Sequence, residues 1–212
     1  MGMFLRRGSA PHRTRLYDKA EGSIIKIAES GTPVEFYIAK HDYEPEINGT
    51  GRTLMVRKDC YDNRAWGSTS VANYAECEID SWLNGDYYNL LDTDMRSKIG
   101  KTTFYYILGN DDTTIRTLQR AVFLLSVREL GDTTYEDSGT ALPIADVLKI
   151  AYLNGAANTQ WTRIPNANDN SGASRYIKAT GSAGGAQRTR QYGSRPVFTL
   201  PGDMILTEDM LA

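Results

Sequence analysis

Paired carboxylates are the groups whose type and spacing come closest to a catalytic arrangement in this sequence. Asp92 lies two residues before Asp94, and Asp111 directly precedes Asp112. Glycoside hydrolysis needs such a pair, with one carboxyl acting as acid and the other as base or nucleophile. Both pairs lie in polar, turn-like segments, where helix capping and solvation explain them better.

Other catalytic signatures are missing from the sequence. Ser126 lies inside an apolar stretch, with neither histidine near it in the chain, and no GxSxG, HExxH or P-loop pattern occurs. The glycine-rich run at 181–185 does not stand between a strand and a helix as a dinucleotide-binding GxGxxG does. We therefore expect no enzymatic activity and no cofactor.

Metal binding is not expected either. A zinc site needs clustered ligands, whereas His12 and His41 are far apart. The segment 166–172, NANDNSG, offers oxygen atoms at alternate positions, but Asp169 is its single carboxylate and calcium loops need several. A turn-rich recognition loop fits the pattern better. Its expected ligand contacts are Asn168, Asp169 and Asn170.

A second candidate contact surface is the glycine-rich segment 181–194, GSAGGAQRTRQYGS. Arginine and tyrosine side chains are enriched where proteins bind partners, although a plain hairpin fits the same composition. The side chains expected to contact a ligand here are Arg188, Arg190 and Tyr192.

The composition is that of an ordinary globular chain. It has 212 residues, 41% hydrophobic and 24% charged, with a net charge of −2, which gives no reason to expect nucleic-acid binding. The longest apolar runs are too short to span a membrane, and the N-terminal residues do not look like a secretion signal, so we expect synthesis in the cytoplasm. In that compartment Cys60 and Cys77 are expected to be free thiols, with a disulfide as the alternative.

The N-terminal residues differ from the rest. Basic side chains occur with no acid before Asp18, and Gly8, Ser9 and Pro11 disfavour regular structure. We expect an arm over residues 1–21, followed by a single domain over 22–212. The arm is either a solvated terminus or a segment that orders on an acidic partner such as a neighbouring subunit, with nucleic acid a weaker alternative. The expected anchors are Arg6, Arg7, Arg13 and Arg15.

The periodicity predicts an α+β fold. Alternating apolar residues indicate a hairpin within 22–43 that turns at 30–33, and Leu54 and Val56 indicate another strand. Apolar residues at Ile79, Trp82, Leu83, Tyr87 and Leu90, with spacings of three and four, predict a helix with one buried face, broken at Gly85. If Trp82 is buried, Trp82→Ala should cost about 3–5 kcal/mol. Further expectations are a short helix from Thr93 to Gly100, a helix over 143–152, strands at 102–109, 121–130, 161–164, 174–179 and 195–200, a loop over 110–119 and a turn over 181–185.

The order of several segments resembles a known family. WLNGDYYNLL, VFLLSVREL, WTRIPN, YIKATGSAGG and SRPVFTLP follow one another as in a domain family of unknown function from Firmicute surface proteins and their phages. The match covers about residues 22–202, and the chain departs from the family pattern at Ile164 and Asn166. The layout is more loosely similar to the C-type-lectin-like fold of formylglycine-generating enzymes and of variable phage receptor-binding proteins. Those enzymes use two cysteines in their C-terminal half, whereas the cysteines here lie in the N-terminal half.

The resemblance implies a C-type-lectin-like fold with a loop-rich C-terminal half. It places the WTR and RP strands side by side, so Trp161 could be a stacking platform, with Arg163 and Arg195 as donors to a sugar or an acidic partner. The alternative is a core tryptophan, with arginines that bind backbone carbonyls.

The expected function is that of a non-enzymatic phage virion protein, in the capsid decoration or the tail, that displays the loops of 155–194. The alternative is a free carbohydrate- or cell-wall-binding module. The expected partners are other virion proteins or copies of the chain, with a host-surface glycan as a further candidate. Neither a membrane nor a nucleic acid is expected.

Overall fold

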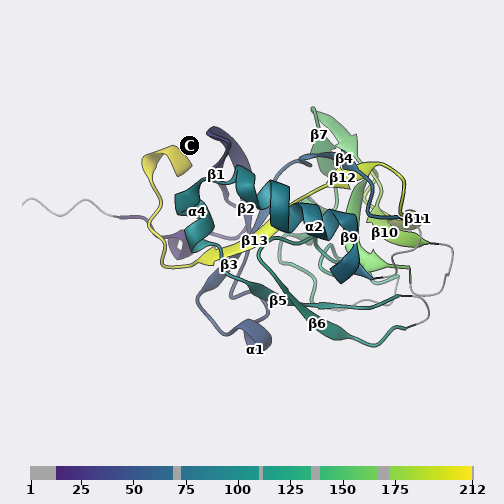
Figure 1. The fold of residues 1–212 in the computed structure, drawn as a ribbon. Coiled ribbons are helices and arrows are strands. Elements are labelled where there is room, and N and C mark those ends of the chain that lie inside the picture. Colours follow the sequence, from purple (N-terminus) through teal and green to yellow (C-terminus); the bar gives the residue numbers. More distant parts are fainter. Residues whose placement is uncertain (1–12, 69–72, 110–111, 135–138, 167–171, 212) are drawn as a thin grey trace, which may run out of the picture.

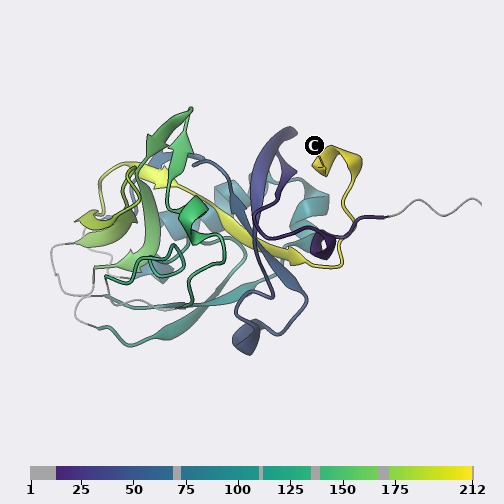
Figure 2. The same ribbon diagram turned by 180° about the vertical axis from the view of Figure 1, so that it is seen from behind.

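The computed structural model describes residues 13–68, 73–109, 112–134, 139–166 and 172–211. Two sheets, two further hairpins and several short helices form one body around a shared apolar core (Figure 1; Figure 2). The α+β class is confirmed. None of the described helices is long and apolar enough to cross a lipid bilayer.

The first sheet contains the predicted N-terminal hairpin. Its strand order is β1-β2-β3-β13, and all its pairs are antiparallel. The hairpin turns at Ser30–Gly31, where φ is 49° and 78°, as a two-residue turn of this kind requires. Alternation buries Ile25 and Ile27 on one face of β1. The strands are β1 (Ile24–Glu29), β2 (Thr32–His41), β3 (Arg52–Arg57) and β13 (Val197–Pro201).

The second sheet contains five strands in the order β11-β10-β9-β12-β4. Neighbouring strands are antiparallel except for β12, which runs parallel to β9. The strands predicted at 161–164 and 174–179 are its centre, and the run at 181–185 enters β11 rather than forming only a turn. The strands are β4 (Asp62–Arg64), β9 (Gln160–Pro165), β10 (Ala173–Ile177), β11 (Ala183–Gln187) and β12 (Tyr192–Ser194).

Two hairpins stand beside these sheets. The predicted loop over 110–119 was wrong in its second half, because β6 (Arg116–Arg120) pairs along its length with β5 (Thr102–Tyr106). All five β6 residues are exposed or half-buried, so the segment shows no apolar alternation that would reveal a strand. The second hairpin joins β7 (Ala151–Leu153) to β8 (Ala156–Asn158).

The long predicted helix is continuous where a break was expected. α2 (Glu78–Trp82) runs through a π-helical turn, η3 (Leu83–Tyr87), into α3 (Tyr88–Leu90), so Gly85 lies in a widened turn instead of ending the helix. Ile79, Leu83 and Tyr87 form its buried face. The helix predicted over 143–152 is a single turn, α5 (Ala145–Leu148), because β7 begins at Ala151. The remaining helical segments are α1 (Pro45–Asn48), α4 (Thr93–Lys98) and the 3-10 turns η1 (Leu16–Asp18), η2 (Tyr74–Glu76) and η4 (Glu208–Met210).

The most apolar segment, 121–130, is not the strand predicted there. It crosses the centre of the molecule as irregular chain, and its backbone partners change from residue to residue. Phe123 exchanges two hydrogen bonds with Val197 of β13, and the carbonyl of Leu125 accepts from Arg163 of β9. Every side chain from Val122 to Val127 is buried whichever way it points, so the apolar run at 121–125 carries no period.

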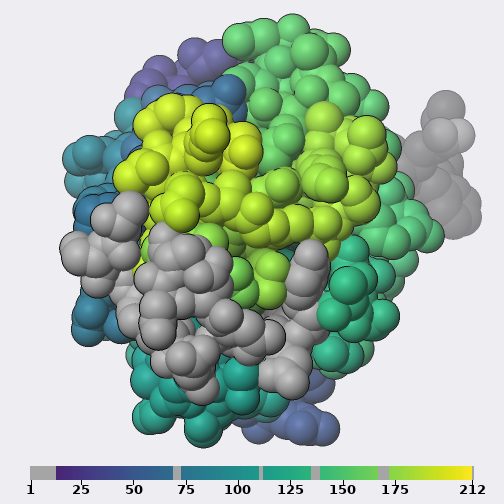
Figure 3. Space-filling view, turned by 90° about the vertical axis from the view of Figure 1, so that its right-hand side faces the viewer, coloured from purple at the N-terminus to yellow at the C-terminus, as the bar shows by residue number. Residues whose placement is uncertain are grey.

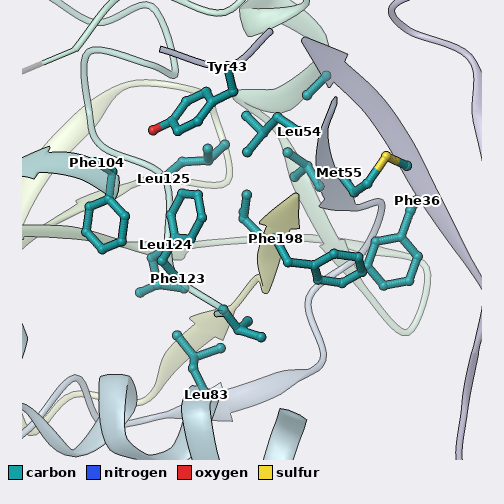
Figure 4. Packing of buried hydrophobic residues seen from close by; sticks show 14 of the residues in the cluster. Phe36, Tyr43, Leu54, Met55, Leu83, Phe104, Phe123, Leu124, Leu125 and Phe198 are labelled. Atoms are coloured by element: carbon teal, nitrogen blue, oxygen red, sulfur yellow. The ribbon is translucent and has the colours of Figure 1, made fainter. Parts of the chain in front are cut away.

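Aromatic rings from this segment and from the strands around it build the core (Figure 4). Phe104 stacks on Phe123 with ring centroids 4.5 Å apart, and Phe36 meets Phe198 at 5.2 Å. All four rings are fully buried. The core therefore joins the first sheet, the β5–β6 hairpin and the central segment into one unit.

The folded body begins earlier than the expected boundary at residue 21. Leu16 is fully buried, and its N–H donates to the carbonyl of Met204 at 2.9 Å. Arg13 and Arg15 are exposed beside the C-terminal segment, whereas the expected anchors Arg6 and Arg7 lie outside the described residues. An arm separate from the body is thus confined to residues before Thr14.

Both cysteines are free and buried, in agreement with the preferred alternative. Burial raises the pKa of each thiol, which keeps it protonated near neutral pH. Ellman's reagent should therefore react very slowly with the native protein and should titrate two thiols in denaturant. Fewer than two thiols in denaturant without reductant would reveal a disulfide.

Asp80 couples the helix to the β5–β6 hairpin and should make stability pH-dependent. Its carboxylate accepts from Arg120 Nε at 2.7 Å, yet burial raises its pKa from 3.8 to about 6. Between those values the folded protein holds a proton that the unfolded chain has released, so this contribution to stability falls as the pH rises from about 4 to 6. Urea unfolding should show this slope in the parent protein and a shallower one in Asp80→Asn. Asp86→Asn, an exposed change on the same helix, is the control, and identical slopes in parent and Asp80→Asn would contradict the prediction.

Candidate binding face

Aromatic side chains from neighbouring strands meet on one face of the five-stranded sheet. Trp161 of β9 lies between Tyr176 of β10 and Tyr192 of β12, with ring centroids 6.2 and 4.9 Å away. The two tyrosine rings are 5.1 Å from each other. Trp161 is only 1% exposed and donates its indole N–H to the carbonyl of Arg64 at 2.9 Å. Both tyrosines are half-buried, so they are the surface of this cluster and Trp161 is its base.

The absence of a side chain at Gly184 makes room for the outer tyrosine. Gly184 of β11 is the register partner of Tyr176. A Cβ at this position would lie 2.7 Å from the tyrosine ring, closer than real Cβ contacts come. Glycine therefore allows Tyr176 to lean over the neighbouring strand while it stays in contact with Tyr192.

The cluster of side chains around Trp161 extends across the sheet to β4. Arg64 is the register partner of Tyr192, so both side chains belong to the same face. Its guanidinium pairs with Asp62 and lies over the ring of Trp82, with Cζ 3.1 Å from the ring centroid. We call the partly exposed residues Tyr176, Tyr192, Arg64 and Trp82 the aromatic strip.

The strip offers the chemistry of a binding surface. From β10 to β4 it crosses three strand intervals, about 14 Å at the usual strand spacing. Aromatic rings with an adjacent guanidinium can pack against the apolar face of a ligand while hydrogen-bonding its polar groups. Figure 3 shows the end of the molecule at which residues 172–194 gather, over β10, β11 and the approach to β12.

Arg163, expected as a ligand donor, is instead the centre of a buried polar network. Its guanidinium binds the Glu129 carboxylate with two contacts, 2.5 and 3.1 Å, and both side chains are fully buried. Its Nε also donates to the carbonyl of Tyr105 at 2.8 Å. Tyr43 donates its hydroxyl to the same carboxylate at 2.5 Å, and burial raises the pKa of Tyr43 well above its ordinary value. The network ties β9 to the central segment and to the chain after β2.

Arg195 and Arg188 are also used by the fold. Arg195 is 2% exposed and donates to three backbone carbonyls, those of Arg57, Lys58 and Leu148, each at 2.7 Å. Burial lowers the pKa of this guanidinium. Arg188 is 1% exposed, donates from Nε to the hydroxyl of Ser174 at 3.2 Å and lies 5.4 Å from the ring of Trp66.

The predicted ligand residues thus separate into three groups. Trp161, Arg163 and Arg195 are buried, as the core alternative requires, and Arg188 is buried as well. Tyr192 is half-buried in the aromatic strip, and Arg190 is exposed beyond the end of β11. Asn168, Asp169 and Asn170 lie outside the described residues.

The sequence analysis did not predict three members of the strip as ligand contacts. Tyr176 and Arg64 sit in short strands where nothing marks them, and Trp82 was assigned to a buried helix face. Cross-strand register brings Tyr176 and Arg64 to this face, and Trp82 joins them through the Arg64 guanidinium that lies over its ring. One sequence does not show the register.

Within the described parts of the chain, no three His, Cys, Asp or Glu side chains cluster closely enough to hold a metal ion. In each carboxylate pair considered from the sequence, one member forms a local ion pair: Asp94 pairs with Lys98, and Asp112 pairs with Arg116. Asp111 is outside the described residues.

Comparison with known proteins gives a family and no characterised relative. No curated protein and no solved structure matches the chain. A family model described as a domain of unknown function, DUF6273, matches residues 50–202. The match begins later than the expected residue 22, so β1 and β2 precede it. Because the match covers well over half of the sequence, the chain belongs to the DUF6273 family.

Proposed function

We propose that this protein is a non-enzymatic binding protein of a phage particle, a capsid-decoration or tail component with a C-type-lectin-like fold. In this proposal the aromatic strip binds a glycan of the host surface. The single observation that carries the binding role is the pair of half-buried tyrosines held over a buried tryptophan on a sheet. The virion role is supported by the resemblance of the sequence motifs alone.

A glycan fits the strip on physical grounds. The carbon-bound hydrogens of a sugar ring make an apolar face that packs on aromatic rings, while its hydroxyls bind polar side chains at the edge. Tyr176 and Tyr192 supply the rings, and Arg64 supplies the donors. The rings are backed by a close-packed sheet, so little conformational entropy is lost when a ligand binds.

Each site would bind weakly, and a particle with many copies would gain avidity.

A free carbohydrate- or cell-wall-binding module is the second candidate, and the same tyrosine pair supports it. The two candidates differ in where the protein is found: a virion component co-purifies with intact particles from the host that encodes it, and a free module does not.

Replacing both Tyr176 and Tyr192 with alanine should abolish most binding to host cell-wall glycans. An aromatic stacking contact contributes about 0.5–1.5 kcal/mol, so loss of both should weaken binding on the order of tenfold or more. Binding of labelled protein to isolated wall material measures this.

The matched control is Tyr152→Ala, which removes a tyrosine that is 44% exposed on the β7–β8 hairpin, outside the strip. Equal binding by the parent, the control and the double variant would refute the strip as the binding face.

A further inference from the structure

An apolar groove with an acidic rim lies on the first sheet, away from the aromatic strip. It has a volume of about 230 Å³, several times the roughly 30 Å³ that one water molecule occupies in the liquid. The β1–β2 hairpin, the start of α4 and the C-terminal turn η4 enclose it, and these elements lie together in both ribbon views (Figure 1; Figure 2). Its apolar lining consists of Ile27, Ala28, Pro33, Met95 and Met210.

The rim carries more acid than base. Asp92, Asp94 and Asp209 line the groove and are exposed, against Lys26 as the one lysine among the described lining residues. Asp94 already pairs with Lys98. Among the residues that the structure describes, Asp92 and Asp209 form no ion pair. The groove thus fits an apolar segment flanked by positive charge.

Such a segment is present in this chain. Residues 1–12 read MGMFLRRGSAPH, in which Met3, Phe4 and Leu5 are followed by Arg6 and Arg7, and there is no acid. The apolar residues match the groove lining and the arginines match its rim.

The described chain starts next to the groove. Leu206 donates its N–H to the carbonyl of Thr14 at 2.9 Å, and Arg15 and Ile205 form an antiparallel bridge. Thr207, the next residue of the C-terminal segment, lines the groove. Five residues, 8–12, connect the apolar–basic segment to Arg13 and span up to about 17 Å when extended.

We propose that the groove binds residues 3–7 of a second copy of the chain. Proline disfavours helical backbone at the residue before it, here Ala10, which favours exchange with a neighbouring copy over a tight return to a groove that begins where the same chain enters. A reciprocal exchange closes a two-fold dimer, and an exchange that does not close makes a larger assembly. The proposal deepens the self-assembly part of the proposed function, rests on that part, and is independent of what the aromatic strip binds.

The test uses the full chain in two isotopic forms. Phe4 is replaced with the photo-crosslinking residue benzoylphenylalanine in unlabelled protein, which is mixed with nitrogen-15-labelled protein and irradiated. Mass spectrometry should find light arm peptides joined to heavy peptides that contain Met95 or Met210. Adducts only between light peptides in a dilute mixture would show that the arm binds its own groove and would overturn the proposal, as would adducts outside the groove.

Light scattering after size exclusion provides the second measurement. The parent should be an oligomer, and Asp92→Asn with Asp209→Asn should weaken the association about tenfold. The control is Asp86→Asn with Asp203→Asn, two exposed carboxylates outside the groove lining. A parent that stays monomeric over the full concentration range would overturn the proposal. The tyrosine variants should keep the parent's mass, so failure of the groove and failure of the glycan face can be told apart.

Discussion

Replacing Glu129 with alanine should lower the free energy of unfolding by about 3–5 kcal/mol, because it leaves a buried guanidinium without its counter-charge. Glu129 and Arg163 are both fully buried, and the hydroxyl of Tyr43 loses its acceptor in the same variant. Removing one member of a buried, hydrogen-bonded pair costs far more than the pair contributes in total, since the remaining charge stays desolvated. Urea unfolding followed by circular dichroism measures the change.

The matched control is Lys98→Ala, which breaks the exposed pair with Asp94. An exposed pair typically contributes less than about 1 kcal/mol. A cost for Glu129→Ala no larger than the cost for Lys98→Ala would contradict the structural role assigned to Arg163.

Replacing Trp161 with alanine should also cost about 3–5 kcal/mol, the usual range for a large buried aromatic residue. The ring is 1% exposed and fills the space beneath both strip tyrosines, and its indole N–H bonds to Arg64. Trp82→Ala is the comparison, because Trp82 is only half-buried and packs beside Tyr61 and the Arg64 guanidinium. Thermal unfolding should therefore rank Trp161→Ala as the less stable variant, and the opposite order would show that the burial of the two tryptophans is misassigned.

The same pair of residues shows what sequence periodicity can and cannot reveal. The spacing of apolar residues predicts the helix over 79–91. The predicted destabilisation of about 3–5 kcal/mol for Trp82→Ala applied only if Trp82 was buried. The buried face proved to be Ile79, Leu83 and Tyr87, at intervals of four. Trp82 lies one residue away from that face, and the π-helical turn after it shifts the later side chains around the axis.

Segments with local signals were predicted well, and segments that depend on distant partners were not. The hairpin that turns at Ser30–Gly31 can be predicted from sequence, because its turn residues and the alternation of apolar and polar residues in both strands lie within a short segment. The segment 121–130 has no such signal: it is buried on all sides, and its backbone bonds go to β9 and β13. Its apolar composition fits a central strand and a buried irregular chain equally well.

The candidate site depended on register in the same way. Trp161 and Tyr192 were predicted from the sequence as ligand contacts, whereas Tyr176 and Arg64 were not. Tyr176 faces Trp161 through the β9–β10 register, and Arg64 faces Tyr192 through the β12–β4 register. These pairings join residues up to 128 positions apart, from Arg64 to Tyr192, so only the folded structure turns a buried tryptophan and scattered side chains into one surface.

Fluorine NMR of protein labelled with 3-fluorotyrosine can show whether the strip tyrosines contact the ligand. Single Tyr→Phe variants assign the resonances of Tyr176, Tyr192 and Tyr152, and host cell-wall polysaccharide is then titrated into the labelled protein. We expect the Tyr176 and Tyr192 signals to shift or broaden together while the Tyr152 signal stays in place. Binding of the polysaccharide that moves other tyrosines and leaves these two unchanged would contradict this expectation.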